Sequence, residues 1–132
     1  MQNLGMRHVA LNVRNVEASK KFYTELFGME LEWQPDVKDA FLTTNGQDNL
    51  ALHQRDDLNI IQGNNSQLLD HIGFVMKTKA CVDEMFAKAK SMNVRIVQAL
   101  KQHRDGAYSF YCADPDGVVV QVIYHSPISD RP

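Results

Sequence analysis

The chain carries the same short sequence pattern twice, 63 residues apart. Residues 7–13 read RHVALNV and residues 70–76 read DHIGFVM, so His8 and His71 take the same place in the two copies. Further positions align with the same offset: Phe22 with Met85, Met29 with Met92 and Leu31 with Val94. The pattern predicts one structural unit written twice, with a histidine early in the first strand of each unit. Two histidines at matching points of a duplicated unit can face each other across a shared cleft, which is how a metal site is built.

Length and composition are those of an ordinary globular domain. The 132 residues are 44% hydrophobic and 23% charged, and a chain of this size can bury about two thirds of its unfolded surface. A half of about 60 residues would be marginal by itself. We therefore predict a single domain spanning residues 1–132, with modules at about 4–54 and 68–126 joined by a linker at 55–67. The cleft is expected where the two modules meet.

Charge and cysteine usage exclude several classes of protein. The net charge is −2 and no basic stripe is present, which argues against a nucleic-acid partner. No segment approaches the run of about 18 apolar residues that a membrane helix needs, and the first residues lack the apolar stretch of a signal peptide. Cys81 and Cys112 are isolated in the sequence, so two reduced thiols are expected rather than a disulfide. These features favour a cytoplasmic protein without a membrane partner.

The first module is predicted to fold as strand, helix and three strands. Residues 8–13 alternate between apolar and polar side chains, which is typical of a half-buried strand. Asn15 can cap a helix whose apolar residues recur at helical spacing, and Gly28 suits the position just after its end. The remaining strands are expected at 30–34, 40–44 and 50–54, with a turn at residues 45–48.

The second module repeats this order. A strand is predicted at 71–76, and Thr78 can cap a helix that stops near Asn93. Strands are expected at 94–101, 108–113 and 118–124, with a hairpin turn at Asp105-Gly106 and a second turn at residues 114–117. Residues 126–132 are predicted to be a short tail.

The period of two in each strand predicts which side chains face away from the helices. Val9, Leu11 and Val13 form the natural face for the first helix, so His8 is expected on the opposite face, and the same argument applies to His71. Gln121 is the polar residue within an otherwise apolar last strand. A buried polar group without a partner costs about 1–3 kcal/mol, so a partner for Gln121 is expected.

Four segments in order resemble the vicinal oxygen chelate superfamily, which includes glyoxalase I, extradiol dioxygenases, fosfomycin-resistance thiol transferases and bleomycin-binding proteins. These segments are HVALNV (8–13), FYTELFGM (22–29), DHIGF (70–74) and FYCADPDG (110–117). The likeness covers nearly the whole chain. It implies an α+β fold of two tandem βαβββ modules whose sheets form a cup-shaped cleft, and it leaves the reaction open because this fold hosts several chemistries.

The resemblance also implies a set of metal ligands. In the family the metal is held from the first and last strands of the modules, which here correspond to His8, His71 and Gln121. The last-strand positions are usually glutamate, whereas this chain has Gln121 and, in the first module, Ala51. His53 lies two residues beyond Ala51 on the same strand face and could supply a fourth nitrogen. The expected cofactor is a divalent ion such as Fe, Ni, Zn or Mn.

These departures from the family pattern have an electrostatic consequence. A divalent ion held by two imidazoles and a carboxamide gains no negative charge from the protein. Burying that charge is costly unless an anion arrives, so the site is expected to be weak at rest or to be completed by an anionic or chelating substrate.

Other polar and aromatic residues have open roles. His103 and His125 are expected to be loop and tail residues, and Arg104 either reaches an anion or lies solvated in the hairpin. Trp33, Phe41, Tyr108 and Tyr111 either line the pocket or fill the core.

Three functions are compatible with the sequence. The first is a metal-dependent enzyme, resembling glyoxalases and dioxygenases, that acts on a small oxygen-rich molecule chelated to the ion. The second is a metal-free protein that binds and sequesters a small molecule, as in the bleomycin-binding branch. The third is a partner-binding domain with a relic cleft. No catalytic base is assigned, since neither Ala51 nor Gln121 accepts a proton usefully near neutral pH. A homodimer is expected, because symmetric homo-oligomers are common.

Overall fold

The computed structural model describes residues 2–58 and 68–131. The chain divides into two compact units, Met1–Ile60 and Ile61–Pro132, and each unit is described by itself. Most of the predicted linker, residues 59–67, lies outside the described residues. None of the helices in the described part of the chain is long and apolar enough to cross a membrane.

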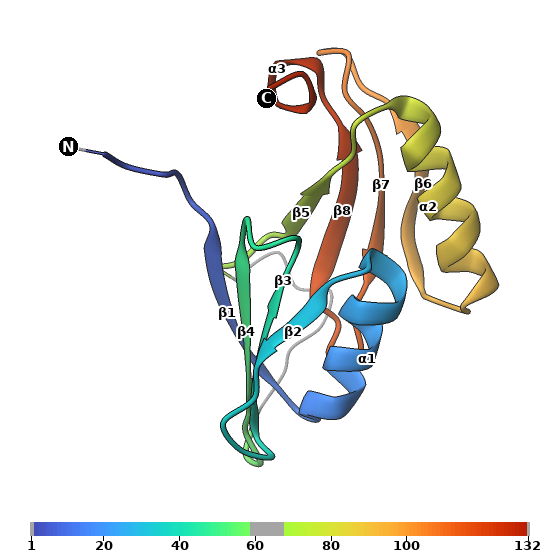
Figure 1. Ribbon diagram of the computed structural model, residues 1–132. Helices are drawn as coiled ribbons and strands as arrows, with labels where there is room; N and C mark the ends of the chain where they lie inside the picture. The colour runs from blue at the N-terminus through green and yellow to red at the C-terminus, as the bar shows by residue number, and fades with distance from the viewer. Residues whose placement is uncertain (1, 59–67, 132) are drawn as a thin grey trace. The chain divides into compact units, whose positions relative to one another are not determined.

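The first unit is a four-stranded mixed sheet with one helix (Figure 1). Its strands lie in the order β1-β4-β3-β2, with β1 parallel to β4 and the other neighbours antiparallel. Its elements are β1 (His8–Val13), α1 (Val16–Phe27), β2 (Glu30–Trp33), β3 (Asp39–Thr43) and β4 (Asn49–Gln54).

The second unit repeats this topology. Its sheet has the order β5-β8-β7-β6, again with the first strand parallel to the last. Its elements are β5 (Ile72–Val75), α2 (Lys79–Ser91), β6 (Ile96–Gln102), β7 (Tyr108–Ala113), β8 (Val119–Tyr124) and α3 (Ser126–Ser129). The prediction of two tandem βαβββ modules is therefore confirmed, while the cup-shaped cleft between them stays a prediction.

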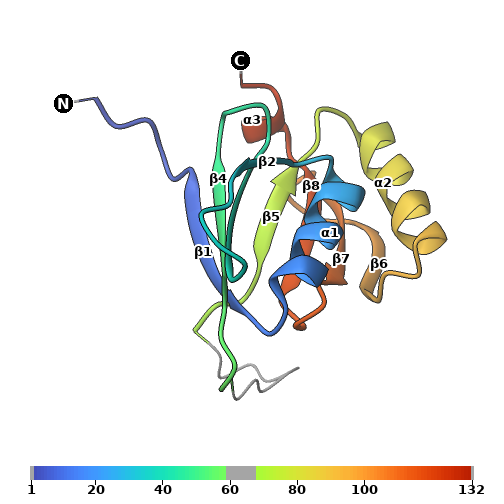
Figure 2. The same cartoon turned by 60° about the horizontal axis from the view of Figure 1, so that its bottom comes forward.

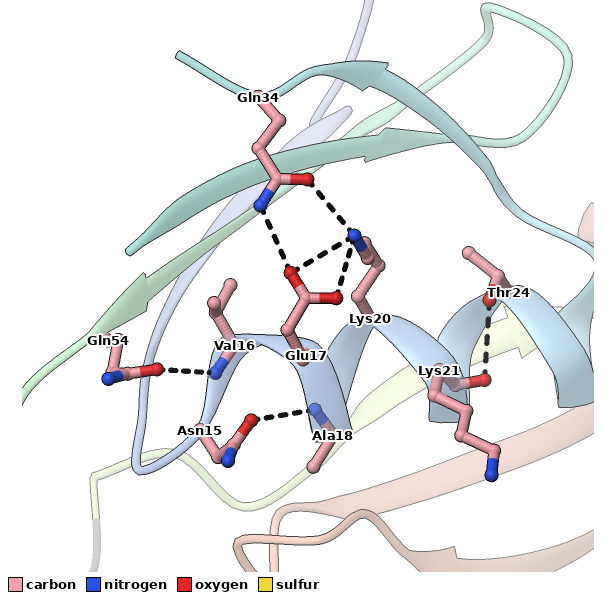
Figure 3. Close-up of polar contacts among 9 residues, drawn as sticks. All are labelled: Asn15, Val16, Glu17, Ala18, Lys20, Lys21, Thr24, Gln34 and Gln54. Carbon is pink, nitrogen blue, oxygen red and sulfur yellow. Dashed lines mark hydrogen bonds and ion pairs between the residues drawn. The ribbon is translucent and has the colours of Figure 1, made fainter. Parts of the chain in front are cut away.

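Helix α1 begins where the sequence predicts, with its first turn held from two sides (Figure 3). The side chain of Asn15 accepts a hydrogen bond from the Ala18 N–H at 2.9 Å, which satisfies one of the free amides of a helix start. Gln54 Oε1, at the end of β4, accepts from the Val16 N–H at 3.0 Å. The helix start is thus tied to the last strand of its own unit.

A second polar group ties α1 to the segment after β2. Lys20 Nζ donates to Glu17 Oε1 at 3.1 Å and to Gln34 Oε1 at 3.0 Å, and Gln34 Nε2 donates to Glu17 Oε1 at 3.2 Å (Figure 3). The helix ends at Gly28, whose φ of 70° is in the left-handed region that favours glycine.

Helix α2 uses the same device at its start and a different one at its end. Thr78 Oγ1 accepts from the Cys81 N–H at 3.1 Å, at the position equivalent to Asn15. After the helix, Asn93 adopts the left-handed φ of 57°, which asparagine tolerates better than most residues. Figures 1 and 2 show α2 lying along one face of the second sheet, where it packs on β6, β7 and β8.

In both units the helix and the facing side of the sheet form the core. Phe86 of α2 meets Phe110 of β7 edge to face, with ring centroids 5.2 Å apart. The fully buried side chains include Val13, Tyr23, Leu26, Leu42 and Leu52 in the first unit and Val82, Phe110, Val120 and Val122 in the second. Cys81 and Cys112 are free thiols, as expected.

The predicted tail at residues 126–132 is wrong in part, because Ser126–Ser129 forms the short helix α3. A proline stands in its first turn, where its fixed φ fits and its missing N–H costs nothing. Ser129 Oγ accepts from the His125 N–H at 2.9 Å, and Ser126 Oγ donates to Asp130 at 2.7 Å.

Candidate functional site

The face of each sheet that the helix does not cover carries the predicted site residues, and we call it the open face. In β1, Leu11 and Val13 are buried whereas His8, Ala10 and Asn12 are exposed. In the second unit, Phe110 and Val122 pair with each other on the helix side. Their neighbours Tyr111 and Gln121 also pair and therefore share the open face.

His8 is held in one orientation by a neighbouring strand. Its Nδ1 lies 2.8 Å from Asn49 Oδ1 of β4, and Asn49 Nδ2 donates to Glu32 Oε1 at 2.9 Å. Because Asn49 uses its N–H toward the glutamate, its oxygen is the acceptor for the imidazole. In its neutral form His8 therefore carries its proton on Nδ1 and has its lone pair on Nε2.

The sequence predicts His71 to be the first residue of a strand, but β5 begins one residue later, at Ile72. Its Nδ1 lies 2.6 Å from Asp70 Oδ1, and its ring meets Tyr111 edge to face with centroids 5.3 Å apart. The carboxylate accepts the Nδ1 proton, so in the neutral form of His71 the lone pair lies on Nε2.

His53 makes the same kind of bond but at a different place on its sheet. Its Nδ1 lies 2.6 Å from Asp39 Oδ1, and this hydrogen bond is the main cause that lowers the pKa of Asp39. The register pairs His8 with Asn49 and Asn12 with His53. His8 and His53 are therefore about four residues apart along the strands, or about 13 Å.

Gln121 is the buried polar group of β8, at 8% exposure. Its Nε2 donates to Ser109 Oγ of β7 at 3.1 Å, which supplies the partner that the sequence analysis anticipated. The bond uses the amide nitrogen and leaves Oε1 for another group.

His103 joins this group from the β6–β7 hairpin. Its Nε2 lies 2.9 Å from Ser109 Oγ, and Ser109 is almost fully buried at 1% exposure. The hydroxyl of Ser109 accepts from Gln121 and can donate to His103. His103 and Ser109 were missed as site residues; the alternation along 109–111 would have put Ser109 on the open face, but no sequence signal shows that the hairpin folds back over it.

A pocket of about 580 Å³ lies over these residues. Its wall is the β6–β7 hairpin, residues 101–105 and Ala107, and its floor is Tyr111, Gln121 and Ile123. All of its lining residues belong to the second unit. Of the aromatic residues left open by the sequence, Tyr111 lines this pocket, whereas Tyr108 donates its hydroxyl to Asp83 of α2 at 2.6 Å.

The first unit has aromatic side chains on its open face instead. Trp33 and Phe41 stack with ring centroids 5.0 Å apart, and Phe41 meets His53 edge to face at 5.8 Å. Ala51 pairs with Ala10 just as Gln121 pairs with Gly73, so Ala51 is the structural counterpart of Gln121.

The predicted metal ligands are drawn from both units. Within residues 2–58 and 68–131, no cluster of three or more His, Cys, Asp or Glu side chains is arranged to hold an ion. The donor set His8, His71, Gln121 and His53 therefore stays a prediction.

The comparisons with known proteins identify the family. A family model described as the glyoxalase/bleomycin resistance protein/dioxygenase superfamily matches residues 5–122. The chain is 31% identical over 121 residues to the uncharacterized protein YwbC of Bacillus subtilis (strain 168), covering 83% of this chain and 89% of that protein. It is 30% identical over 120 residues to a trivalent organoarsenical cleaving enzyme of Bacillus sp. (strain MD1), covering 83% of this chain and 66% of that enzyme.

Solved structures agree on the fold. A lactoylglutathione lyase from Agrobacterium tumefaciens matches with a TM-score of 0.74 and 22% identity, covering 94% of this chain and 96% of that chain. A glyoxalase/dioxygenase from Nostoc punctiforme matches with a TM-score of 0.77 and 20% identity, covering 92% and 90%. The resemblance seen in the sequence is thereby confirmed.

Proposed function

Since this chain belongs to the glyoxalase/bleomycin resistance protein/dioxygenase superfamily, we propose that it is a metal-dependent enzyme that acts on a small oxygen-rich molecule. The proposed ligands of the divalent ion are Nε2 of His8, Nε2 of His71 and Oε1 of Gln121. The ion would act as a Lewis acid that stabilises negative charge on a chelated substrate oxygen.

One observation carries the proposal: the Nδ1 atoms of His8 and His71 both face an oxygen acceptor of their own unit. The distances are 2.8 Å to Asn49 and 2.6 Å to Asp70. Histidines that bind metals in proteins usually donate their second N–H in this way, which fixes the tautomer and makes the other nitrogen more basic. Both imidazoles are thus prepared for an electrophile at Nε2.

His53 shares this hydrogen-bond pattern but has a weaker claim to the same ion. It lies about 13 Å along the strands from His8, and its ring is fixed between Asp39 and Phe41. We therefore propose three protein ligands, with His53 forming a separate pair with Asp39.

The proposed ligand set has no net charge, which bears on the substrate. A divalent ion that keeps its full +2 charge in a partly buried site is stabilised most by a chelating anion, because the anion offsets the cost of removing that charge from water. The substrate class we propose is therefore an anion or an enolisable molecule with two neighbouring oxygens. The base of such a reaction has to come from the substrate or from a residue other than Ala51 or Gln121.

The activity of the organoarsenical-cleaving relative is not part of this proposal. Trivalent arsenic is a soft centre that prefers thiolate ligands, as soft metals do. In this chain Cys112 is buried, on the helix side of its sheet, and burial together with the charge of Asp114 raises the pKa of its thiol to about 12. Cys112 therefore does not provide a thiolate for arsenic on the open face of the second unit.

A second candidate function is metal-free binding of a small molecule. The pocket of about 580 Å³ belongs to one unit and includes Gln121, and its volume is in the range of small-molecule sites. A binding protein of this kind needs no ion.

Elemental analysis of protein purified without a chelator separates the two functions. The enzyme is expected to carry one divalent ion per chain, which is lost in His8→Ala and in His71→Ala but kept in the control His125→Ala. Metal-free wild-type protein that still binds a small molecule would favour the binding function and contradict the enzyme.

Substitution Gln121→Glu tests the third ligand. It adds a negative charge to a neutral ligand set, so we expect the ion to bind about tenfold more tightly, measured by competition with a fluorescent chelator. Gln47→Glu makes the same chemical change on an exposed turn and should leave the affinity unchanged. Equal affinities for the two variants would show that Gln121 is not a ligand.

A further inference from the structure

The β6–β7 hairpin brings two cations to the pocket of the second unit. Lys101 and Arg104 both line it, together with the single acid Asp105. These three side chains give the wall a formal charge of +1, in a chain whose net charge is −2. The wall of the pocket is therefore net positive although the whole chain is net negative.

The position of Lys101 is fixed by the sheet. It pairs with Ser109 across β6 and β7, and directly paired residues point to the same side. Because Ser109 bonds Gln121 on the open face, Lys101 is directed to that face as well. The register of β6 shifts between Gln98 and Lys101, and such a bulge re-aims the residues that follow it.

The charges of the hairpin are available to a ligand. Among residues 2–58 and 68–131, neither Lys101 nor Arg104 takes part in an ion pair or side-chain hydrogen bond. Asp105 Oδ1 is occupied by the Ala107 N–H at 3.0 Å, which shapes the turn. Asp105 therefore accepts a hydrogen bond from the backbone of its own turn, whereas Lys101 and Arg104 have no such partner among the described residues.

The floor of the pocket adds neutral hydrogen-bonding groups and an apolar side chain. Gln121 is held by Ser109 through its nitrogen. Burial, and then the charge of Asp70, raises the pKa of Tyr111, so its phenol stays protonated. Ile123 supplies the apolar part.

We propose that this pocket binds a small organic anion whose carboxylate or phosphonate group lies between Lys101 and Arg104, with its apolar part against Tyr111 and Ile123. The guanidinium of Arg104 can bind such a group with two parallel hydrogen bonds. This site shares Gln121 with the proposed metal site, but Lys101 and Arg104, which would hold the anion, are not proposed metal ligands, so anion binding can be tested without the ion.

The test is a titration of the full chain, freed of metal on a chelating resin so that no soluble chelator competes as an anion. The probes are phenylphosphonate and benzoate, with benzamide as the neutral control of similar shape. Binding is followed through backbone amide chemical shifts of the hairpin. We expect both anions to bind at least about tenfold more tightly than benzamide, and more weakly in 1 M than in 0.1 M NaCl, where screening is weaker.

Variants that remove one positive charge test whether the anion binds at the β6–β7 hairpin. Lys101→Gln and Arg104→Gln are each expected to weaken anion binding about 3- to 10-fold. Lys88→Gln, on the exposed surface of α2, removes the same charge elsewhere in the unit and should have no effect. Circular dichroism of each variant confirms that the fold is kept.

Three results would overturn the proposal. Benzamide could bind as tightly as the anions, or Lys88→Gln could weaken binding as much as Arg104→Gln. Anion binding could also vanish on the resin and return with added Zn²⁺, which would assign the anion to the ion. Loss of metal in His8→Ala with unchanged anion binding would instead support both proposals separately.

Discussion

The open faces of the two units are built on the same frame and carry different chemistry. The register makes Ala51 the counterpart of Gln121, Phe41 of Tyr111 and Asp39 of Ser109. The first unit fills these positions with stacked aromatic rings and a histidine–aspartate pair. The second fills them with the hydrogen-bonded group Gln121, Ser109 and His103, beneath a pocket.

The pocket of the second unit lies against a hairpin that is longer than its counterpart in the first unit. In the first unit Leu31 pairs with Leu42, eleven positions further on, whereas in the second Ile96 pairs with Cys112, sixteen positions further on. The extra length lies in the β6–β7 hairpin that forms the pocket wall. A repeated fold can thus acquire a pocket in one copy by lengthening a hairpin while its core and strand order stay the same.

The largest expected effect tests a feature that the two units share: in each, the face of the sheet covered by the helix is buried. Cys112 belongs to that side in the second unit, and its pKa of about 12 leaves only about 1 in 10⁴ of its thiol ionised at pH 8. With a thiol-reactive chromogenic disulfide, we expect Cys112 in the native protein to react at least about 100-fold more slowly than in the unfolded protein.

Two variants assign the reacting thiols. Cys81→Ser should remove the fast reaction of the native protein, and Cys112→Ser should leave it in place. A fast reaction that survives in Cys81→Ser would show that the helix side of the second sheet is open.

The next effect tests the difference between the open faces. Ala51→Gln places the residue of the second unit at the matching point of the first, where Ala51 is 1% exposed and paired with Phe41. Overpacking should lower the free energy of unfolding by about 1–3 kcal/mol, measured by urea denaturation. Gln47→Ala on the exposed turn should change it by less than about 0.5 kcal/mol. An unchanged midpoint for Ala51→Gln would mean that the first open face already has room for a pocket.

The smallest effect tests the likeness of the helix starts. Asn15→Ala and Thr78→Ala each remove a side-chain acceptor from the first turn, and each should cost about 1 kcal/mol in unfolding free energy. The loss in α1 is expected to be the smaller one, because Gln54 still accepts from its Val16 N–H. A larger loss for Asn15→Ala would show that this contact with β4 depends on the cap.

The fold could be predicted from the sequence because it rests on local, repeated signals. The alternation at residues 8–13, the caps Asn15 and Thr78 and the glycine at 28 were each confirmed. The offset of 63 residues even places the two caps at matching positions. Such signals depend on neighbours in the chain and need no knowledge of tertiary contacts.

The pocket could not be predicted in the same way. His103 reaches Ser109 because the hairpin folds back, and Lys101 faces the same way because the register of β6 shifts. The alternation of apolar and polar residues along a strand predicts neither the folded-back hairpin nor the register shift. The metal ligand set of His8, His71, Gln121 and His53 remains a prediction, although the partner expected for Gln121 was found in Ser109.

The pairing of β1 with β4 and of β5 with β8 has a consequence for synthesis of the chain on the ribosome. Each sheet is closed by hydrogen bonds between its earliest and its latest strand, so neither can form completely until the whole unit has emerged. The first can do so once Gln54 is available, while the second has to wait for Tyr124, 70 residues later. Long-range pairing of this kind slows folding, so during synthesis the first sheet can be complete while β5 still lacks its partner strand β8.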